Sequence, residues 1–343
     1  MKPTQLSQPA APTSTAPGRA GMRAIVQRRY GASPEKVLAL GQVAVPAIGA
    51  DEVLVRVRAA GVDRGTWHLM AGQPYLMRLL GFGLRGPKNR VPGLDLAGTV
   101  VAAGAGVTGF RAGDEVFGIG RGSFADYAAA RADKLARKPA RLSFAQAAAV
   151  AVSGLAALQG LRTGRLQAGQ QVLVIGASGG VGSYAVQLAK AFGAQVTGVC
   201  STGKTDLVRS LGADHVIDYT AGDFADGCHH YDLILDTGGN SRLSRLRRAL
   251  TPTGTLVIAG SEGGKWTGMG RQVRALMLSP FTRQRLTTYL SRHRQHDLDT
   301  LRQLTETGQI TPLIGRTYPL ADAPQAIRDL HEGHARGKTA ITI

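Results

Sequence analysis

One short stretch at residues 171–183, QVLVIGASGGVGS, most constrains what this chain can fold into. It begins with an apolar run typical of a buried strand, continues through a glycine-rich turn, and ends in residues whose apolar positions recur at helical spacing. A strand, a tight turn and a helix N-terminus together suit a diphosphate, because backbone N–H groups and the helix dipole attract the anion and glycines let it come close. The stretch therefore predicts a nucleotide-binding site.

The glycine pattern itself leaves an alternative open. In the dinucleotide pattern GxGxxG, the first glycine position is here Ala177, whereas Gly179 and Gly182 hold the other two. Glycines at these places could serve only the packing of a helix against a strand. The position of the turn, between an expected strand and an expected helix, favours the dinucleotide.

A second pattern overlaps the turn and belongs to a different class of protein. Residues 176–180, GASGG, match GxSxG, the nucleophile elbow of α/β-hydrolases, and would make Ser178 the nucleophile. Asp236 and His331 follow in the order that a hydrolase triad requires. Val181 and Gly182 instead complete a phosphate turn, so we favour nucleotide binding over hydrolysis.

From residue 171 onward, apolar runs alternate with segments of helical period. The expected strands cover 171–176, 195–200, 215–219, 232–236 and 255–260, and the expected helices cover 180–192, 204–211 and 241–250. Strands that alternate with helices in this way predict a doubly wound parallel α/β sheet.

The remainder of the chain has a different pattern, in which short strands are separated by glycines. Such strands are expected at 23–28, 52–60, 95–103 and 114–118, and again at 313–318 and 339–343, which indicates a small β-barrel. A helix is expected at 142–161, with a capping box formed by Ser143 and Gln146. We therefore expect a disordered tail at 1–21, a discontinuous barrel domain at 22–150 and 286–343, and a nucleotide-binding domain at 151–285.

The end of the second strand of the nucleotide domain bears on the choice of cofactor. NAD enzymes carry an acid there to bind the ribose 2′-hydroxyl, whereas this strand ends in Cys200, Ser201, Thr202, Gly203 and Lys204. Small hydroxyls and a lysine suit a 2′-phosphate, which a carboxylate would repel. The sequence therefore favours NADPH.

Positive charge is concentrated in one segment of a chain whose net charge is +18. Residues 241–296 hold ten arginines and Lys265 against one acid, Glu262. Such a segment is either a solvated face or a surface for an anionic partner, which could be nucleic acid, a membrane or the cofactor phosphates. Within it, residues 269–290 have the pattern of a basic amphipathic helix or a pocket lid.

Cysteine is scarce, since the chain holds only Cys200 and Cys228. Two cysteines form no disulfide framework and no cysteine-rich zinc cluster. We expect a reducing compartment and a cytoplasmic location.

Several longer motifs together give a specific resemblance. They are AGVDRGTWHLMAGQPY (60–75), VPGLDLAGTVVAAG (91–104), GDEVFG (113–118), GSFADY (122–127), VLVIGASGGVGSYAVQLAK (172–190), LGADHVIDY (211–219) and EGHARGKTAITI (332–343). Across nearly all of residues 22–343 the chain resembles the medium-chain dehydrogenase/reductase superfamily, and within it the zinc-free quinone oxidoreductase branch. The resemblance implies a GroES-like β-barrel catalytic domain, a Rossmann domain with the active cleft between the two, and a homodimer that pairs the strand at 255–260.

The resemblance also implies a set of residues that bind NADPH. The 2′-phosphate contacts fall on Ser201 or Thr202, on Lys204 and on Tyr219. The complete expected set is Ser153, Ala177, Ser178, Gly179, Gly180, Val181, Gly182, Ser201, Thr202, Lys204, Tyr219, Thr237, Gly260 and Lys338.

The chain departs from its zinc-dependent relatives at the metal site. Those relatives have cysteine where Asp63 stands and His-Glu where Leu94 and Asp95 stand, and tetrahedral zinc needs such ligands. The cluster at 228–230, Cys-His-His, is too compact for a site of its own. Without a Lewis acid, the expected reaction is hydride transfer to a quinone or an α,β-unsaturated carbonyl, with an NAD(P)-dependent alcohol dehydrogenase as the alternative.

Candidate catalytic residues come from the loop expected after the strand at 52–60. Trp67 and Tyr75 could stack on a flat acceptor, and Tyr75 could donate a hydrogen bond to its carbonyl oxygen, although both could equally pack in the barrel core. Asp63 is expected to be protonated, turned toward Arg64, or accepting from a ribose hydroxyl. Met70 is a further candidate for the pocket wall.

Overall fold

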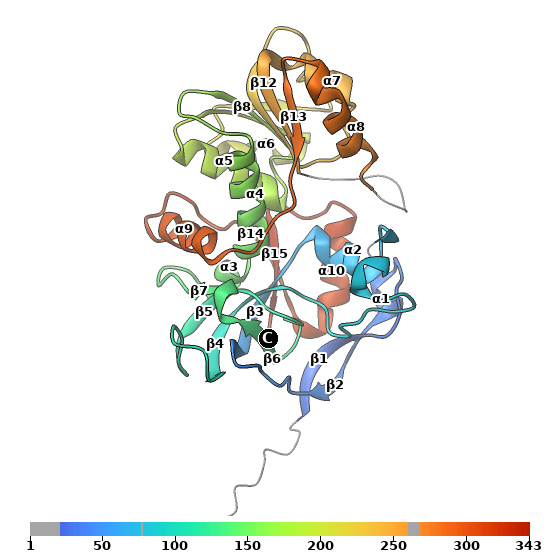
Figure 1. Ribbon diagram of the computed structural model, residues 1–343, viewed down its shortest axis with the longest axis vertical. Coiled ribbons are helices and arrows are strands. Elements are labelled where there is room, and N and C mark those ends of the chain that lie inside the picture. The colour runs from blue at the N-terminus through green and yellow to red at the C-terminus, as the bar shows by residue number, and fades with distance from the viewer. Residues whose placement is uncertain (1–20, 77, 260–267) are drawn as a thin grey trace, which may run out of the picture.

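The computed structural model describes residues 21–76, 78–259 and 268–343, which form two lobes (Figure 1). Of the tail expected at 1–21, only Gly21 is described, and Gly260 lies outside the described residues. The chain builds the lower lobe of Figure 1 first, crosses to the upper lobe in its middle part, and returns to the lower lobe near its C-terminus.

The upper lobe contains a six-stranded parallel sheet, which confirms the predicted doubly wound fold. Its strands run in the order β10-β9-β8-β11-β12-β13, the order of a dinucleotide-binding fold. They are β8 (Gln171–Ile175), β9 (Gln195–Cys200), β10 (His215–Asp218), β11 (Tyr231–Asp236), β12 (Leu250–Ile258) and β13 (Arg285–Thr288).

Helices cover both faces of this sheet, because side chains of a strand point alternately to opposite sides. Val172 and Val174 of β8 pack in a core with α4 and α5, whereas Leu173 and Ile175 pack in a second core with α7 and α8. The helices of this lobe are α4 (Ala151–Thr163), α5 (Gly180–Ala191), α6 (Thr205–Ser210), α7 (Leu243–Arg248) and α8 (Gly270–Leu278).

The lower lobe is a β-barrel-like sheet in the order β14-β15-β3-β4-β5-β7, with β6 paired to β3 and a separate β1-β2 hairpin. Its strands are β1 (Gly21–Gln27), β2 (Leu38–Ala44), β3 (Glu52–Val62), β4 (Asp95–Ala103), β5 (Glu115–Ile119), β6 (Tyr127–Arg131), β7 (Leu135–Arg137), β14 (Ile314–Pro319) and β15 (Lys338–Thr342). Its helices are α1 (Pro34–Val37), α2 (Arg64–Ala71), a π-helical turn η1 (Arg78–Phe82), α3 (Phe144–Ala148), α9 (Gln295–Glu306) and α10 (Ala323–His331). The antiparallel pairing of β15 with β3 joins the C-terminal segment to the first part of the chain.

The capping box expected at the start of a helix is present in the structure. Ser143 and Gln146 form the capping box at the start of α3. The helix expected over 142–161 is divided into α3 and α4.

Three expectations need correction around β12 and β13. Strand β13 pairs in parallel with β12, so the parallel sheet extends past the boundary expected at 285. For the same reason β12 lies between β11 and β13 and is not the edge strand expected at 255–260. Residues 269–290 do not form one amphipathic helix, because α8 ends at Leu278 and β13 begins seven residues later.

No helix in the described ranges has the length and apolar character needed to cross a membrane. Both cysteines are free, Cys200 in the core of the upper lobe and Cys228 at the surface.

Candidate active site

The glycine turn joins β8 to α5 and faces the gap between the lobes. Gly176 has a left-handed φ of 80°, and its carbonyl oxygen accepts a hydrogen bond of 3.0 Å from Gly179 N. A Cβ at Gly182 would lie 2.0 Å from the same carbonyl oxygen, so only glycine lets the first turn of α5 approach the strand. The backbone is therefore shaped as a diphosphate cradle.

A cavity of about 970 Å³, here called the cofactor cleft, runs from this turn between the two lobes. It is lined by most of the residues predicted to bind the cofactor, namely Ser153, Ser178, Gly179, Gly180, Val181, Ser201, Lys204, Tyr219, Thr237 and Lys338, and by Asp63. These residues lie far apart in the sequence, and the fold brings them together in one cleft.

Three other predicted residues do not line the cleft. Ala177 and Gly182 are buried beneath the turn, so any contribution they make is to its shape. Thr202 is exposed and its hydroxyl lies 2.9 Å from the hydroxyl of Thr220, whereas Ser201 lines the cleft.

A buried ion pair of the lower lobe, between Lys338 and Asp95, lies beside the glycine turn, and Lys338 also bonds to Ser153 of α4 in the other lobe. Lys338 at the start of β15 donates a hydrogen bond of 3.0 Å to Ser153 Oγ, and its Nζ lies 3.5 Å from Asp95 Oδ2. A Cβ at Gly180 would lie 3.1 Å from Lys338 Cδ, which places this side chain against the turn. The other oxygen of Asp95 accepts a hydrogen bond of 2.7 Å from Val152 N.

Burial dominates the electrostatics of Asp95, which is fully inaccessible to solvent. Desolvation raises the pKa of Asp95 to about 7, although the nearby Lys338 ammonium opposes the shift. The carboxyl therefore titrates near neutral pH.

Lys204 is connected to the opposite lobe. Its ammonium donates hydrogen bonds of 3.0 Å to Gly333 O and 2.9 Å to Ala335 O, in the loop between α10 and β15. Partial burial, and then the charge of Arg336, lower the pKa of Lys204. Arg336 is a residue that the sequence reasoning missed: a Cβ at Gly203 would lie 3.9 Å from its Nη2. Arg336 is part of the motif EGHARGK, but only the tertiary fold brings it close to the turn that follows β9.

The hydrolase triad considered from the sequence is not assembled. Asp236 is buried and pairs with Arg271 Nη1 at 2.6 Å, while its other oxygen accepts hydrogen bonds from the backbone of Gly238 and Gly239. The ring of His331 stacks on Trp67. Ser178 lines the cofactor cleft instead of facing this acid.

Asp63 caps a helix, which corrects the expectation of a loop here. Residues 64–71 form α2, and Asp63 Oδ1 accepts a hydrogen bond of 3.0 Å from Thr66 N at its start. Oδ1 of Asp63 is therefore used by the helix cap. Oδ2 is buried, lies beside the cofactor cleft and has no hydrogen bond within the described residues.

The two aromatic candidates have other partners than a flat acceptor. Trp67 stacks on His331 of α10 with ring centroids 3.9 Å apart and an interplanar angle of 5°. The Arg78 guanidinium lies 4.7 Å from the ring centre of Tyr75. Neither Trp67 nor Tyr75 lines the cofactor cleft, and their stacking on an acceptor stays a prediction.

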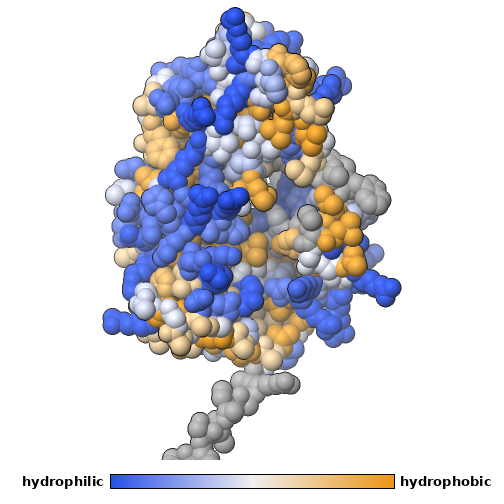
Figure 2. All heavy atoms as spheres, viewed as in Figure 1, coloured by the Kyte–Doolittle hydropathy of each residue, from blue (hydrophilic) through white to orange (hydrophobic). Residues whose placement is uncertain are grey.

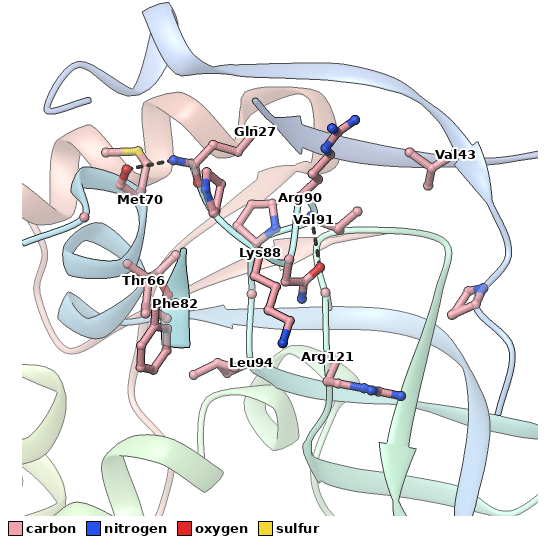
Figure 3. A pocket seen from close by; sticks show the side chains of 18 of the residues that line it. Gln27, Val43, Thr66, Met70, Phe82, Lys88, Arg90, Val91, Leu94 and Arg121 are labelled. Carbon is pink, nitrogen blue, oxygen red and sulfur yellow. Dashed lines mark hydrogen bonds between the residues drawn. The ribbon is translucent and has the colours of Figure 1, made fainter. Parts of the chain in front are cut away.

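A second cavity, here called the barrel cavity, lies on the other side of α2 (Figure 3). It has a volume of about 780 Å³, and its walls come from the β1-β2 hairpin, α2, residues 78–94 and β6. Asp63 and Gly65 line the cofactor cleft, whereas Thr66, His68 and Met70 line the barrel cavity. Helix α2 is thus a wall shared by two hollows.

The residues at the metal position of related dehydrogenases do not fit zinc. Leu94 offers no ligand atom, and one oxygen of Asp63 is already used by the helix cap. The cluster of possible ligands found in the described part of the chain, Asp329 with Glu332 and His334, is largely exposed and does not line the cofactor cleft.

The arginines of segment 241–296 partly serve the fold. Arg245 pairs with Asp223, Arg271 with Asp236, and Arg285 donates to Thr163 O. The segment is therefore not one uniform basic face.

Comparisons with known proteins agree with this architecture. Residues 49–140 match the family model of the alcohol dehydrogenase GroES-like domain, and residues 211–341 match that of the zinc-binding dehydrogenases. A quinone oxidoreductase of Sus scrofa is 32% identical over 344 residues, covering 96% of this chain and 99% of the relative. A 2-methylene-furan-3-one reductase of Solanum lycopersicum is 36% identical over 244 residues, covering 64% of this chain and 61% of the relative. The solved quinone oxidoreductase of Coxiella burnetii is 28% identical with a TM-score of 0.84, covering 94% of this chain and 100% of that one.

Proposed function

The chain belongs to the medium-chain dehydrogenase/reductase superfamily, in its quinone-oxidoreductase-like branch, and from that premise we propose that it reduces quinones or α,β-unsaturated carbonyls with NADPH and without zinc. That it is an oxidoreductase using a nicotinamide cofactor follows from its relatives. The observation that carries the proposal is the cofactor cleft between the lobes, in which the glycine turn, Lys204 and Lys338 come together.

The proposed reaction is the transfer of a hydride from a bound nicotinamide to an electron-poor acceptor. A bound nicotinamide supplies a hydride, and an acceptor whose carbonyl is conjugated can spread the developing negative charge over its own bonds. The residues of this chain therefore act mainly by positioning. The glycine turn and Lys338 hold the diphosphate end, and the acceptor lies in the same cofactor cleft, where it can contact the nicotinamide directly.

The residues at the former metal position support a reaction without zinc. Leu94 and the capped Asp63 supply no tetrahedral set, so an alkoxide would lack the Lewis acid that related alcohol dehydrogenases use. We therefore prefer reduction of an electron-poor acceptor to the alternative of alcohol oxidation.

The preference for NADPH rests on the groups beside β9. Ser201, Lys204 and Tyr219 line that end of the cofactor cleft, and Arg336 approaches from the other lobe. The Arg336 charge disfavours the charged form of Lys204, and an anion placed near both cations would relieve their repulsion. A 2′-phosphate is such an anion.

Replacement of Arg336 tests this preference. Arg336→Gln is expected to lower kcat/KM about tenfold with NADPH and to change it little with NADH, because a charge-assisted contact contributes about 1.5 kcal/mol. Arg209→Gln is a matched control, since Arg209 is exposed and pairs with Asp206 away from the cofactor cleft. Equal losses with both cofactors would contradict the assignment.

A panel of acceptors tests the reaction itself. We expect oxidation of NADPH with an aromatic quinone or a 2-alkenal, at rates that a chelator does not change. Chelator-sensitive oxidation of a primary alcohol would instead support the alcohol dehydrogenase alternative. Binding of NADPH without turnover of any acceptor would overturn the substrate assignment.

We also propose a homodimer, paired through β13 in place of the strand first expected. In the described sheet β13 is an outer strand, and the neighbouring α8 and the turn after it expose Leu276, Met277 and Phe281 (Figure 2). An outer strand next to exposed apolar residues is suited to pairing with a second copy. Phe281→Asp is expected to shift the sedimentation coefficient toward that of a monomer. The cytoplasmic location remains a prediction.

A further inference from the structure

The barrel cavity has the dimensions of a small-molecule site but lies apart from the reaction. Its volume is about 780 Å³, and small-molecule sites have roughly 300–1,000 Å³. Among the described residues it shares no lining residue with the cofactor cleft, and helix α2 lies between the two cavities. A molecule in the barrel cavity does not touch a nicotinamide in the cleft, so its occupant is something other than the hydride acceptor.

Apolar side chains from four parts of the chain line this cavity (Figure 3). They are Val43 of β2, Leu69 and Met70 of α2, Phe82 of η1, and Val91 and Leu94 in the segment before β4. Met70 is 1% exposed and Phe82 is 45% exposed, so the wall runs from the core to the surface. An apolar molecule that displaces water from such a concave wall is bound favourably.

The cations that line the cavity do not form an anion site. The Arg78 guanidinium donates hydrogen bonds to two backbone carbonyl oxygens at the end of α2, and Arg121 pairs with Glu52. Lys88 and Arg90 are exposed, and their side chains point in different directions (Figure 3). The interior therefore favours a neutral molecule.

Two buried polar groups of the wall are available to such a molecule. Thr66 is 2% exposed, and its hydroxyl has no hydrogen bond within the described residues. Gln27 is 3% exposed, and its amide nitrogen donates to Arg29 O at 3.0 Å and to Met70 O at 2.7 Å, which leaves its amide oxygen as an acceptor. A buried polar group without a partner is unfavourable. A ligand hydroxyl both donates and accepts hydrogen bonds, so it can pair with either group.

We propose that the barrel cavity is a second ligand site, which binds a neutral molecule with an apolar body and one hydroxyl group while a dinucleotide occupies the cofactor cleft. The apolar body lies against Met70, Phe82 and Leu94, and the hydroxyl pairs with Thr66. The site does not depend on the proposed reaction, because its occupant takes no part in hydride transfer.

The probe for this site is 2-naphthol, whose binding is measured by calorimetry. We expect one saturable site, with a Kd that differs less than about twofold between the free protein and the protein saturated with NADPH. Thr66→Val keeps the shape of the side chain and removes its hydroxyl, and it should raise the Kd for 2-naphthol about fivefold. The same variant should not lower the free energy of unfolding in urea, because the hydroxyl that it removes has no partner in the fold.

Filling the cavity is the second arm of the test. Leu94→Trp should abolish saturable binding of 2-naphthol, because the larger ring takes the place of the ligand. Leu79→Trp is the matched control, since Leu79 is 67% exposed and does not line the cavity. Unchanged binding of NADPH by Thr66→Val and Leu94→Trp would show that both variants fold.

Several outcomes would overturn the inference. Binding of 2-naphthol that NADPH abolishes would place the probe in the cofactor cleft, and a Kd that Thr66→Val and Leu94→Trp leave unchanged would place it elsewhere on the surface. Absence of saturable binding would have the same force. Tighter binding of 2-naphthoate than of 2-naphthol, lost in Lys88→Gln, would overturn the choice of a neutral ligand. If 2-naphthol binds as expected but no quinone or enone is reduced, the proposed function fails and the second site stands.

Discussion

The cofactor cleft and the barrel cavity share α2 as a wall, yet they are shaped by different parts of the polypeptide. The cleft depends on backbone: Gly176 takes a left-handed φ, and Gly182 allows an approach that a Cβ would block. The barrel cavity depends on side chains from segments that are far apart in sequence, such as Val43, Leu94 and Arg121. A site made of backbone leaves a sequence signature, whereas a site made of packed side chains does not.

The largest expected effect concerns the buried ion pair beside the cofactor cleft. Lys338→Met removes the cation that favours the charged form of Asp95, so the buried carboxyl is left either charged without a partner or protonated, and the free energy of unfolding is expected to fall by about 3 kcal/mol. Urea unfolding measures the loss. The double variant Asp95→Asn with Lys338→Met should recover most of the stability but not the affinity for NADPH. Full recovery of both would show that Lys338 has no part in binding.

The dependence of the cofactor cleft on the backbone of the glycine turn is tested at Gly182. Gly182→Ala places a Cβ 2.0 Å from Gly176 O, so the turn must shift. We expect the Kd for NADPH to rise about 100-fold, or about 2.7 kcal/mol, in fluorescence titration. Gly109→Ala is the control, because a Cβ there meets nothing within 4 Å. Unchanged affinity in Gly182→Ala would show that the shape of the turn does not govern binding.

The separation of the barrel cavity from the cofactor cleft is tested by filling the barrel cavity with a larger side chain. Leu94→Trp is expected to leave the Kd for NADPH within about twofold of the native value, because Leu94 lines the barrel cavity and does not line the cofactor cleft. Leu79→Trp is the control, since Leu79 is 67% exposed and does not line the cavity. A Kd for NADPH that rises in Leu94→Trp but not in Leu79→Trp would show that the two cavities are not separate sites.

The remaining effect is a dependence of stability on pH. The pKa of Asp95 is about 7 in the folded chain against 3.8 as an ordinary carboxyl, so the folded state holds this proton more tightly. The stabilisation from this group is complete below 3.8 and is lost as pH rises through about 7. The stability difference between the native protein and Asp95→Asn should therefore decrease over this range in urea unfolding. A difference that increases with pH would show that the Lys338 charge, rather than burial, controls the carboxyl.

The sequence predicted the fold and the cofactor cleft because their signals are local. The strand, the turn and the helix at 171–191 are contiguous, and the lack of zinc ligands is visible at Asp63 and Leu94 without any structure. The partners of Trp67 and Lys204 were not predictable, since His331 and Gly333 lie far away in sequence. Exposed cations such as Lys88 follow no periodic pattern, so the sequence does not show that they line a cavity.

The bonds from Lys204 to the carbonyls of Gly333 and Ala335 also have a kinetic consequence. They tie β9 of one lobe to the loop before β15 of the other, so the lobes cannot separate at this end without breaking them. If the lobes open to admit a dinucleotide, these bonds add to the barrier for opening. We therefore expect Lys204→Ala to hasten both association and dissociation of NADPH in stopped-flow fluorescence.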